Sequence, residues 1–286
     1  MKNKKQLAFL VLALLMPVLY HVLNSDWYYL WFNLNLVDAL PSDLKGYLLA
    51  NSFSFDTVFC ALLLVVVLPY YLWRRKDLVS NTPQEYVERF TAKSLLPLVV
   101  ITLGAGGLTA ICQLSMRTLL SDVEVVGESV QTFDATFAAA STGHEYFWMF
   151  LSIALLGPVI EELIFRGVLF TELNRYCSGL VVVLITSIYF GLWHSNPIQM
   201  VYTSVLGLII GLSYVATRNM WFPMIIHLFN NMLATLPPSL ESDETLMLIM
   251  VVVKFVAIIP MIVILYKKLK NNPAVTWKFA NTSTSN

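Results

Sequence analysis

Long apolar segments constrain the fold of this 286-residue chain more than any other feature. A helix needs about 20 apolar residues to cross the hydrocarbon core of a bilayer. Seven segments approach that length: 7–23, 57–73, 95–116, 146–165, 198–216, 221–237 and 246–266. An eighth, 180–194, is shorter but apolar throughout, and we count it as a span. Because only 13% of the residues are charged, against roughly 25% in soluble domains, the sequence predicts an all-α polytopic membrane bundle of about eight transmembrane helices.

The distribution of lysine and arginine predicts the orientation of these spans, since both residues favour the cytoplasmic side. With eight spans and a cytoplasmic N-terminus, all but three of the 18 basic residues fall inside; Lys45 and Arg117 fall outside, and Lys254 lies in the last span. We therefore predict that both termini are cytoplasmic, with 272–286 as a polar tail and 117–145 as a long outer loop. Such an arrangement fits an integral protein of a bacterial inner membrane, with an internal eukaryotic membrane as the alternative.

The N-terminal segment also has the basic start and apolar run of a signal peptide. No small-x-small cleavage site follows it, so we expect a retained first span. No repeat or linker divides the chain, and we expect a single membrane-embedded domain over 1–286. The formal net charge of zero gives no argument for nucleic acid as a partner, and the three widely spaced cysteines are expected to be small buried hydrophobes.

A few polar side chains interrupt the apolar segments. A charge at membrane depth costs roughly 2.5–3.5 kcal/mol on insertion scales, so such residues face a bundle interior or a wet cavity and usually mark function. The set comprises Glu161, Glu162, Arg166, His194, His227, Asn230, Asn231 and Lys254. We assign no role to Lys254.

The stretch GPVIEELIFRGVLF, 157–170, places two carboxylates and an arginine in one apolar run. On a helix, Glu161 and Glu162 point about 100° apart, so we expect different roles for them. Glu162 lies four residues before Arg166, the favourable spacing for an ion pair. Glu161 is then expected to face the cavity, where a carboxylate suits a general base. The alternative is that both carboxylates merely hydrogen-bond neighbouring helices or lie at the cytoplasmic interface.

Two further segments carry histidine. His194 closes the segment 180–194, and by itself it also fits an interfacial histidine. His227 and Asn231 share one face of a helix, where helix–helix hydrogen bonding is the alternative. Together with the Glu pair, these groups can activate a water: a carboxylate takes its proton, a histidine orients it and an amide stabilises an oxyanion. Two histidines and one glutamate are equally the ligands of a hydrolytic zinc site, although the chain has no HExxH.

These residues resemble the three motifs of the CAAX-protease and bacteriocin-processing (CPBP) family of intramembrane proteases, which includes the Ras-converting CAAX endopeptidase. The motifs are Glu161-Glu162-x-x-x-Arg166, Phe190-x-x-x-His194 and His227-x-x-x-Asn231. Their order, spacing and membrane setting match over about 157–235. The resemblance implies a helical fold with an enclosed polar cavity and a catalytic core within 146–237. It also implies hydrolysis of a peptide bond in a membrane-associated protein or peptide, and the family's eukaryotic members cleave lipid-modified, prenylated ends.

By this resemblance, the motif positions imply a role for each residue. Glu161 is the water-activating base, and Glu162 assists it or pairs with Arg166. His194 orients the water or binds a metal, His227 completes the site, Asn231 stabilises the oxyanion, and Phe190 belongs to the second motif. The family has been described both as metalloproteases and as metal-independent glutamate proteases. A zinc ion on Glu161, His194 and His227 therefore remains open. We favour the base-activated water, because asparagine is a good oxyanion donor and a poor zinc ligand.

Two other functions remain open. A catalytically inactive scaffold or immunity protein would keep the fold, although the intact motif set argues against it. A proton-coupled transporter would also use intramembrane Glu and His, although the chain lacks repeat halves.

The predicted spans also raise a geometric difficulty. At 1.5 Å per residue, Glu161 would lie ~22 Å from the outer face and His194 ~21 Å from the inner face of a core of ~30 Å. Contact between them requires a longer, shifted or tilted fourth helix, or a later start of the fifth segment.

Overall fold

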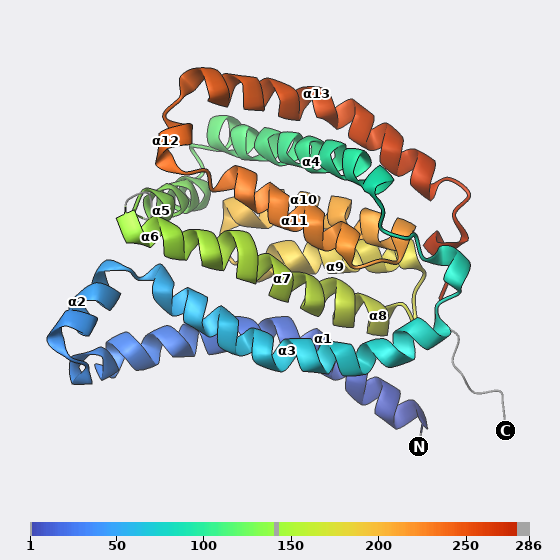
Figure 1. Ribbon diagram of the computed structural model, residues 1–286, viewed down its shortest axis with the longest axis horizontal. Coiled ribbons are helices and arrows are strands. Elements are labelled where there is room, and N and C mark those ends of the chain that lie inside the picture. Colours follow the sequence, from blue (N-terminus) through green and yellow to red (C-terminus); the bar gives the residue numbers. More distant parts are fainter. Residues whose placement is uncertain (1, 140–142, 279–286) are drawn as a thin grey trace.

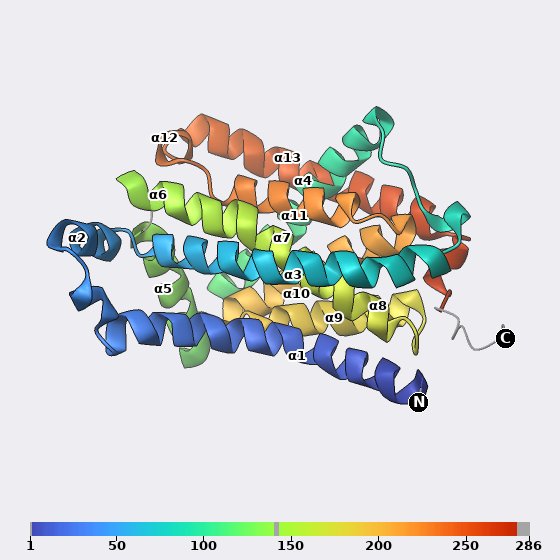
Figure 2. The same cartoon turned by 60° about the horizontal axis from the view of Figure 1, so that its bottom comes forward.

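The computed structural model describes residues 2–139 and 143–278, and within these ranges it contains helices and no strand. The long helices lie side by side along one common direction, as Figures 1 and 2 both show. This arrangement is the all-α helical bundle that the apolar segments predict.

Six helices in the described ranges are long and apolar enough to cross a membrane. Five of them contain a single α-helix: α1 (Lys2–Tyr28, continued by a π turn, Tyr29–Asn33), α3 (Phe53–Asn81), α4 (Ala92–Leu119), α10 (Pro197–Thr217) and α13 (Glu244–Leu269). The sixth is a composite helix at His144–Leu173. It joins α6 (Gly143–Met149), a π segment (Phe150–Leu156), α7 (Gly157–Glu162), a second π segment (Leu163–Leu169) and α8 (Phe170–Leu173).

The other two expected spans form shorter helices, α9 (Gly179–Trp193) of 15 residues and α11 (Trp221–Ala234) of 14 residues. At 1.5 Å per residue each is roughly 21–23 Å long, less than the ~30 Å of a hydrocarbon core. All eight apolar segments are therefore helical, and six of them have the full length of a span. Besides α5, described below, the remaining elements are the short turns and helices Leu36–Ala39, α2 (Ser42–Ala50), Gln84–Tyr86, α12 (Pro238–Glu241) and Pro273–Val275.

The predicted outer loop 117–145 is not an open loop in its described part. It contains α5 (Glu124–Ala139), a 16-residue helix that packs against α4 and α10. Arg117, at the end of α4, donates two hydrogen bonds to Asp134, at 2.8 and 2.6 Å. Helix α5 packs on the bundle through its apolar side, where Val126 is buried in a cluster with Met116 and Ile198.

The predicted tail 272–286 begins as part of the bundle. Ala274 is fully buried, and its carbonyl accepts a hydrogen bond from Arg218 at 2.6 Å. Asn174 donates to the carbonyl of Trp277 at 3.0 Å. The rest of the predicted tail, 279–286, lies outside the described residues.

The composite helix runs through the middle of the molecule, in contact with α1, α3, α9 and α11. Every residue from Ile160 to Asn174 is buried. Arg166 therefore lies inside the bundle. The orientation count had placed it among the basic residues of the cytoplasmic side. The composite helix also continues eight residues beyond the predicted end at 165, because its apolar surroundings continue to Leu173.

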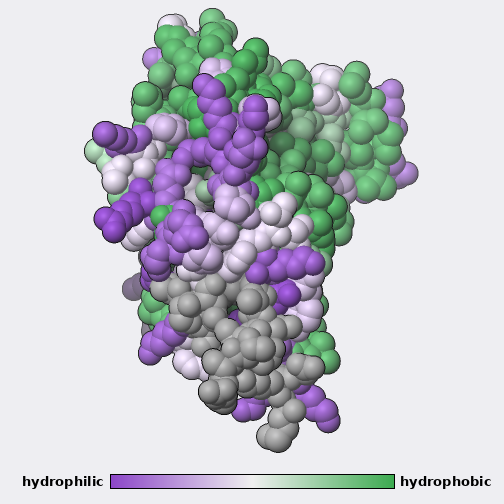
Figure 3. Space-filling view, turned by 90° about the vertical axis from the view of Figure 1, so that its right-hand side faces the viewer, coloured by the Kyte–Doolittle hydropathy of each residue, from purple (hydrophilic) through white to green (hydrophobic). Residues whose placement is uncertain are grey.

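Hydrophilic residues gather at the end of the bundle where α1 begins and α13 ends, which faces the viewer in Figure 3. Hydrophobic side chains cover the flanks beside this end. Many of the exposed large hydrophobic residues belong to α1, α3, α4 and α13, as expected of helices whose outer faces contact lipid.

Candidate active site

The site is built on α7, where Glu161 and Glu162 follow each other at the centre of the composite helix. Glu162 and Arg166 have no solvent exposure at all, whereas Glu161 keeps 9%. Of the two carboxylates, Glu161 is thus the one that a small molecule in the site can reach.

Arg166 holds Glu162 in place. Its Nη1 donates to Glu162 Oε1 at 2.8 Å, which is the pairing that the four-residue spacing predicts. Its Nη2 donates to the carbonyl of Gly207 on α10 at 2.9 Å, and its guanidinium lies 5.0 Å from the centroid of the Phe190 ring. The ion pair therefore also ties α7 to α9 and α10.

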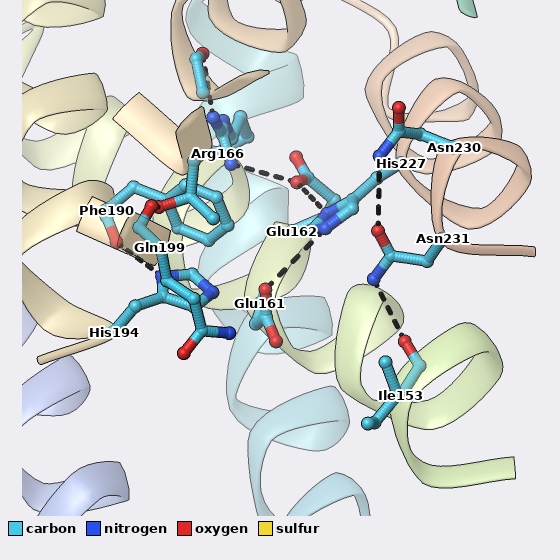
Figure 4. Close-up of polar contacts among 12 residues, drawn as sticks. Ile153, Glu161, Glu162, Arg166, Phe190, His194, Gln199, His227, Asn230 and Asn231 are labelled. Carbon is cyan, nitrogen blue, oxygen red and sulfur yellow. Dashed lines mark hydrogen bonds and ion pairs between the residues drawn. The ribbon is translucent and has the colours of Figure 1, made fainter. Parts of the chain in front are cut away.

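His227, on α11, lies between the two carboxylates (Figure 4). Its Nδ1 is 2.8 Å from Glu162 Oε1 and its Nε2 is 3.7 Å from Glu161 Oε2. The two glutamates point in different directions, as their positions on the helix predict. The imidazole contacts both because its two nitrogens lie on different sides of the ring, and each one faces a different carboxylate.

His194 follows the end of α9, and its Nδ1 lies 2.8 Å from the carbonyl oxygen of Phe190. A carbonyl only accepts hydrogen bonds, so Nδ1 is the donor, and in the neutral ring Nε2 carries the lone pair. The Phe190 ring lies against both imidazoles, with centroid distances of 4.8 Å to His194 and 5.7 Å to His227. The second motif thus lies beside His227, which itself faces Glu161, so the predicted difference in depth does not keep the motifs apart.

Asn231, one turn after His227, donates from Nδ2 to the carbonyl of Ile153 at 2.9 Å. Ile153 lies in the π segment, where each N–H bonds to the carbonyl five residues earlier; Gly157 N bonds to Ser152 O in this way. The next residue, Pro158, has no N–H to give to Ile153. Asn231 supplies the missing donor, and Asn230 Nδ2 lies 3.4 Å from Asn231 Oδ1.

Sequence reasoning missed three participants in this region. In Figure 4, the side-chain amide of Gln199 points toward Glu161 and lies beside His194. In the sequence, a glutamine this close to a loop does not stand out as a polar residue buried in a membrane span. The carbonyls of Ile153 and Gly207 are backbone groups and leave no residue-type signal. Pro158 was the one available indication that a carbonyl near the Glu pair lacks its donor.

Two hollows lie beside the site. A cleft of about 580 Å³ runs between α3, the composite helix and α11. Val159 and Leu163, which flank the Glu pair, line it together with Met224, and Arg75 and Arg218 also line it. A second hollow of about 420 Å³ is lined by His194 and by residues of α5 such as Ser129.

The side chains do not form a metal site as they are arranged. Within the described ranges, no group of three His, Cys, Asp or Glu residues is placed to hold a metal ion. Of the expected ligands, His194 uses Nδ1 for a backbone carbonyl, and His227 uses Nδ1 for Glu162. In both rings these contacts leave Nε2 for another partner, as in histidines that bind water or a metal ion.

Comparisons with known proteins agree with the motifs. The family model "Type II CAAX prenyl endopeptidase Rce1-like" matches residues 143–233. The Bacillus subtilis (strain 168) "Putative membrane peptidase YdiL" is 29% identical over 83 residues, which are 29% of this chain and 34% of that protein. The Staphylococcus aureus (strain USA300) "Membrane-embedded CAAX protease MroQ" is 32% identical over 85 residues, which are 28% of this chain and 34% of that protein.

The similarity thus spans about a third of the length of each of these relatives. No solved structure matches the chain. The segment matched by the family model contains all three motifs and every side chain of the Glu–His–Asn arrangement described above. Over residues 143–233, the chain is therefore similar to the Rce1-like CAAX prenyl endopeptidases and to these two bacterial membrane peptidases.

Proposed function

We propose that this protein is an intramembrane endopeptidase that hydrolyses a peptide bond of a membrane-associated protein or peptide. The observation that carries the proposal is the buried array in which His227 lies between Glu161 and Glu162. An imidazole held by one carboxylate and facing another is an arrangement suited to proton transfer. We further propose that the protein resides in a bacterial inner membrane with both termini cytoplasmic.

In the proposed reaction, Glu161 is the general base. It removes a proton from a water molecule that also donates a hydrogen bond to Nε2 of His194. The water oxygen bonds to the carbonyl carbon of the substrate, and the electron pair of the C=O double bond moves to its oxygen. When this oxyanion collapses, the C–N bond breaks, and the leaving amine takes the proton from Glu161.

The other residues hold this machinery in position. Glu162, balanced by Arg166, accepts the Nδ1–H of His227 and fixes the tautomer of the ring. Asn231 has two amide N–H groups and uses one for Ile153. We assign its second N–H to the oxyanion. These roles are supported by the contacts and by the positions of the residues in the family motifs.

The cleft between α3 and α11 supports an apolar substrate. Val159 and Leu163, which line it, belong to the same composite helix as the two glutamates, so a segment bound there would contact the helix that carries the proposed base. We propose that the substrate is an apolar or lipid-modified peptide segment. The mixed lining of the cleft, with Arg75 and Arg218 among apolar residues, suits a peptide with an apolar part and an anionic part.

We also propose that hydrolysis uses a base-activated water without a metal, because asparagine at position 231 is a good oxyanion donor and a poor zinc ligand. The test is cleavage of a quenched peptide library by the detergent-purified protein, with Glu161→Ala and the matched control Glu241→Ala. Glu241 is exposed on α12, outside the three motifs. Loss of cleavage only in Glu161→Ala, with a chelator having no effect on the wild type, is the expected result.

Two results would contradict the proposal at different levels. Inhibition of the wild type by chelator, reversed by added zinc, would overturn the metal-free reaction and leave the peptidase. Equal cleavage by the wild type and Glu161→Ala would overturn the peptidase itself and favour an inactive scaffold.

A further inference from the structure

Gln199 lies in the first turn of α10, close to the two catalytic motifs on α7 and α9. The helix begins at Pro197, and the side chain of Asn196 caps it by accepting the backbone N–H of Gln199 at 3.4 Å. Oriented peptide dipoles give the N-terminus of a helix a partial positive charge. A negative charge that develops near Gln199 is therefore favoured before any side chain is considered.

The loop before α10 brings Gln199 next to His194. Ser195 has a left-handed backbone, with φ of 61°, and Asn196 N donates to the carbonyl of His194 at 2.7 Å. These two features reverse the chain within a few residues. As a result the imidazole of His194 and the amide of Gln199 lie on the same side, facing Glu161 (Figure 4).

Helix α5 fixes this loop. Ser129 Oγ donates to Asn196 Oδ1 at 2.6 Å and accepts the N–H of Ile198 at 2.9 Å. Asn196 Nδ2 donates back to the carbonyl of Ser129 at 3.2 Å. Three hydrogen bonds between one serine residue and this loop therefore hold the start of α10, which is the support that a precisely placed donor requires.

The side-chain amide of Gln199 is oriented by one hydrogen bond, to the hydroxyl of Tyr202 one turn along α10. Because the amide nitrogen carries two hydrogens, a second N–H is left for another acceptor. In Figure 4 the amide nitrogen points toward Glu161 and has no hydrogen bond to any other residue drawn. Asn231 likewise gives one N–H to Ile153 and keeps a second.

We infer that Gln199 is a further catalytic residue, whose Nε2–H donates a hydrogen bond to the carbonyl oxygen of the scissile peptide bond. The inference rests on the proposed peptidase function. As water attacks, that oxygen gains an electron pair, and the hydrogen bond from Gln199 strengthens with the charge. Together with the remaining N–H of Asn231, it provides a pair of donors of the kind that stabilises oxyanions.

The test compares Gln199→Met and Gln199→Ala with Gln131→Ala, an exposed glutamine on α5, on a peptide that the wild type cleaves. Methionine nearly matches the shape of glutamine but has no donor. Removing one oxyanion donor lowers kcat by about 10²–10³, and we expect that loss in both Gln199 variants, with KM within about twofold and the pH profile unchanged. Gln131→Ala should match the wild type.

The outcomes separate this inference from the function on which it rests. Full kcat in Gln199→Met, in an assay where Glu161→Ala is inactive, would overturn the role of Gln199 and leave the peptidase. A rise in KM alone would also overturn it, since an oxyanion donor acts in the transition state. Equal rates for the wild type and Glu161→Ala would overturn both.

Discussion

The buried charges around Glu162 show how single residues hold the site. One oxygen, Glu162 Oε1, receives hydrogen bonds from both Arg166 and His227. In the described part of the chain, Oε2 of the same carboxylate and Nε of Arg166 have no hydrogen-bond partner. Burial of the Glu162–Arg166 ion pair therefore has a desolvation cost, and its role here is to orient His227.

Removing one partner of this pair should destabilise the protein strongly. Arg166→Met leaves the Glu162 carboxylate buried without its cation, and breaking a buried pair costs about 3–5 kcal/mol. We expect a clear fall in the thermal unfolding temperature of the detergent-purified variant. The double variant Glu162→Gln, Arg166→Met should recover much of that loss. An unchanged unfolding temperature for Arg166→Met would contradict the role given to the pair.

At the scale of elements, the composite helix differs most from a sequence-based expectation. The apolar run 146–165 predicts a helix but does not indicate π turns, because hydrophobic patterning carries no information about the hydrogen-bond register. Pro158 predicts a freed carbonyl, yet the partner of that carbonyl lies on α11, 78 residues away. The residue types of the site were therefore readable from the sequence, whereas their mutual contacts depend on how α7, α9 and α11 pack.

The link between Pro158 and Asn231 gives a second prediction. Asn231→Ala leaves the buried carbonyl of Ile153 without a donor, which costs about 1–3 kcal/mol. Pro158→Ala restores an N–H five residues after Ile153. In the double variant we expect thermal stability to recover while peptide cleavage stays low, because the oxyanion donor is still absent.

Two measurements on the same preparations check this link. Differential scanning fluorimetry in detergent reports stability, and the peptide assay reports turnover. If Pro158→Ala lowers the stability of the Asn231→Ala variant further, the proposed hydrogen-bond exchange is wrong.

At the scale of the whole molecule, α1 begins and α13 ends at the same end of the bundle (Figure 1). Hydropathy alone predicted the eight helical segments, and six have the full length of a span. Hydropathy does not predict which charged residues are buried inside the protein. The count of basic residues treated Arg166 as cytoplasmic, since a charge that is paired inside the bundle and a charge in a loop look alike in sequence.

The orientation can be tested by labelling single cysteines in a variant that lacks Cys60, Cys112 and Cys177. Lys4→Cys and Lys270→Cys place thiols at exposed positions near the two termini, and Glu241→Cys places one at the opposite end. An impermeant maleimide should label Glu241→Cys in intact bacterial cells, and the other two only after the membrane is permeabilised. Labelling of Lys270→Cys in intact cells would contradict an even number of crossings with cytoplasmic termini.

The most direct test of the central claim is the single-turnover rate of the wild type against Glu161→Gln on one defined peptide bond. This substitution keeps the shape of the side chain and removes the base. General-base catalysis contributes about 10²–10⁴ in rate, so we predict a fall of that size, with an unfolding temperature unchanged within about 2 °C. A rate equal to that of the wild type would contradict Glu161 as the base, and with it our account of the site.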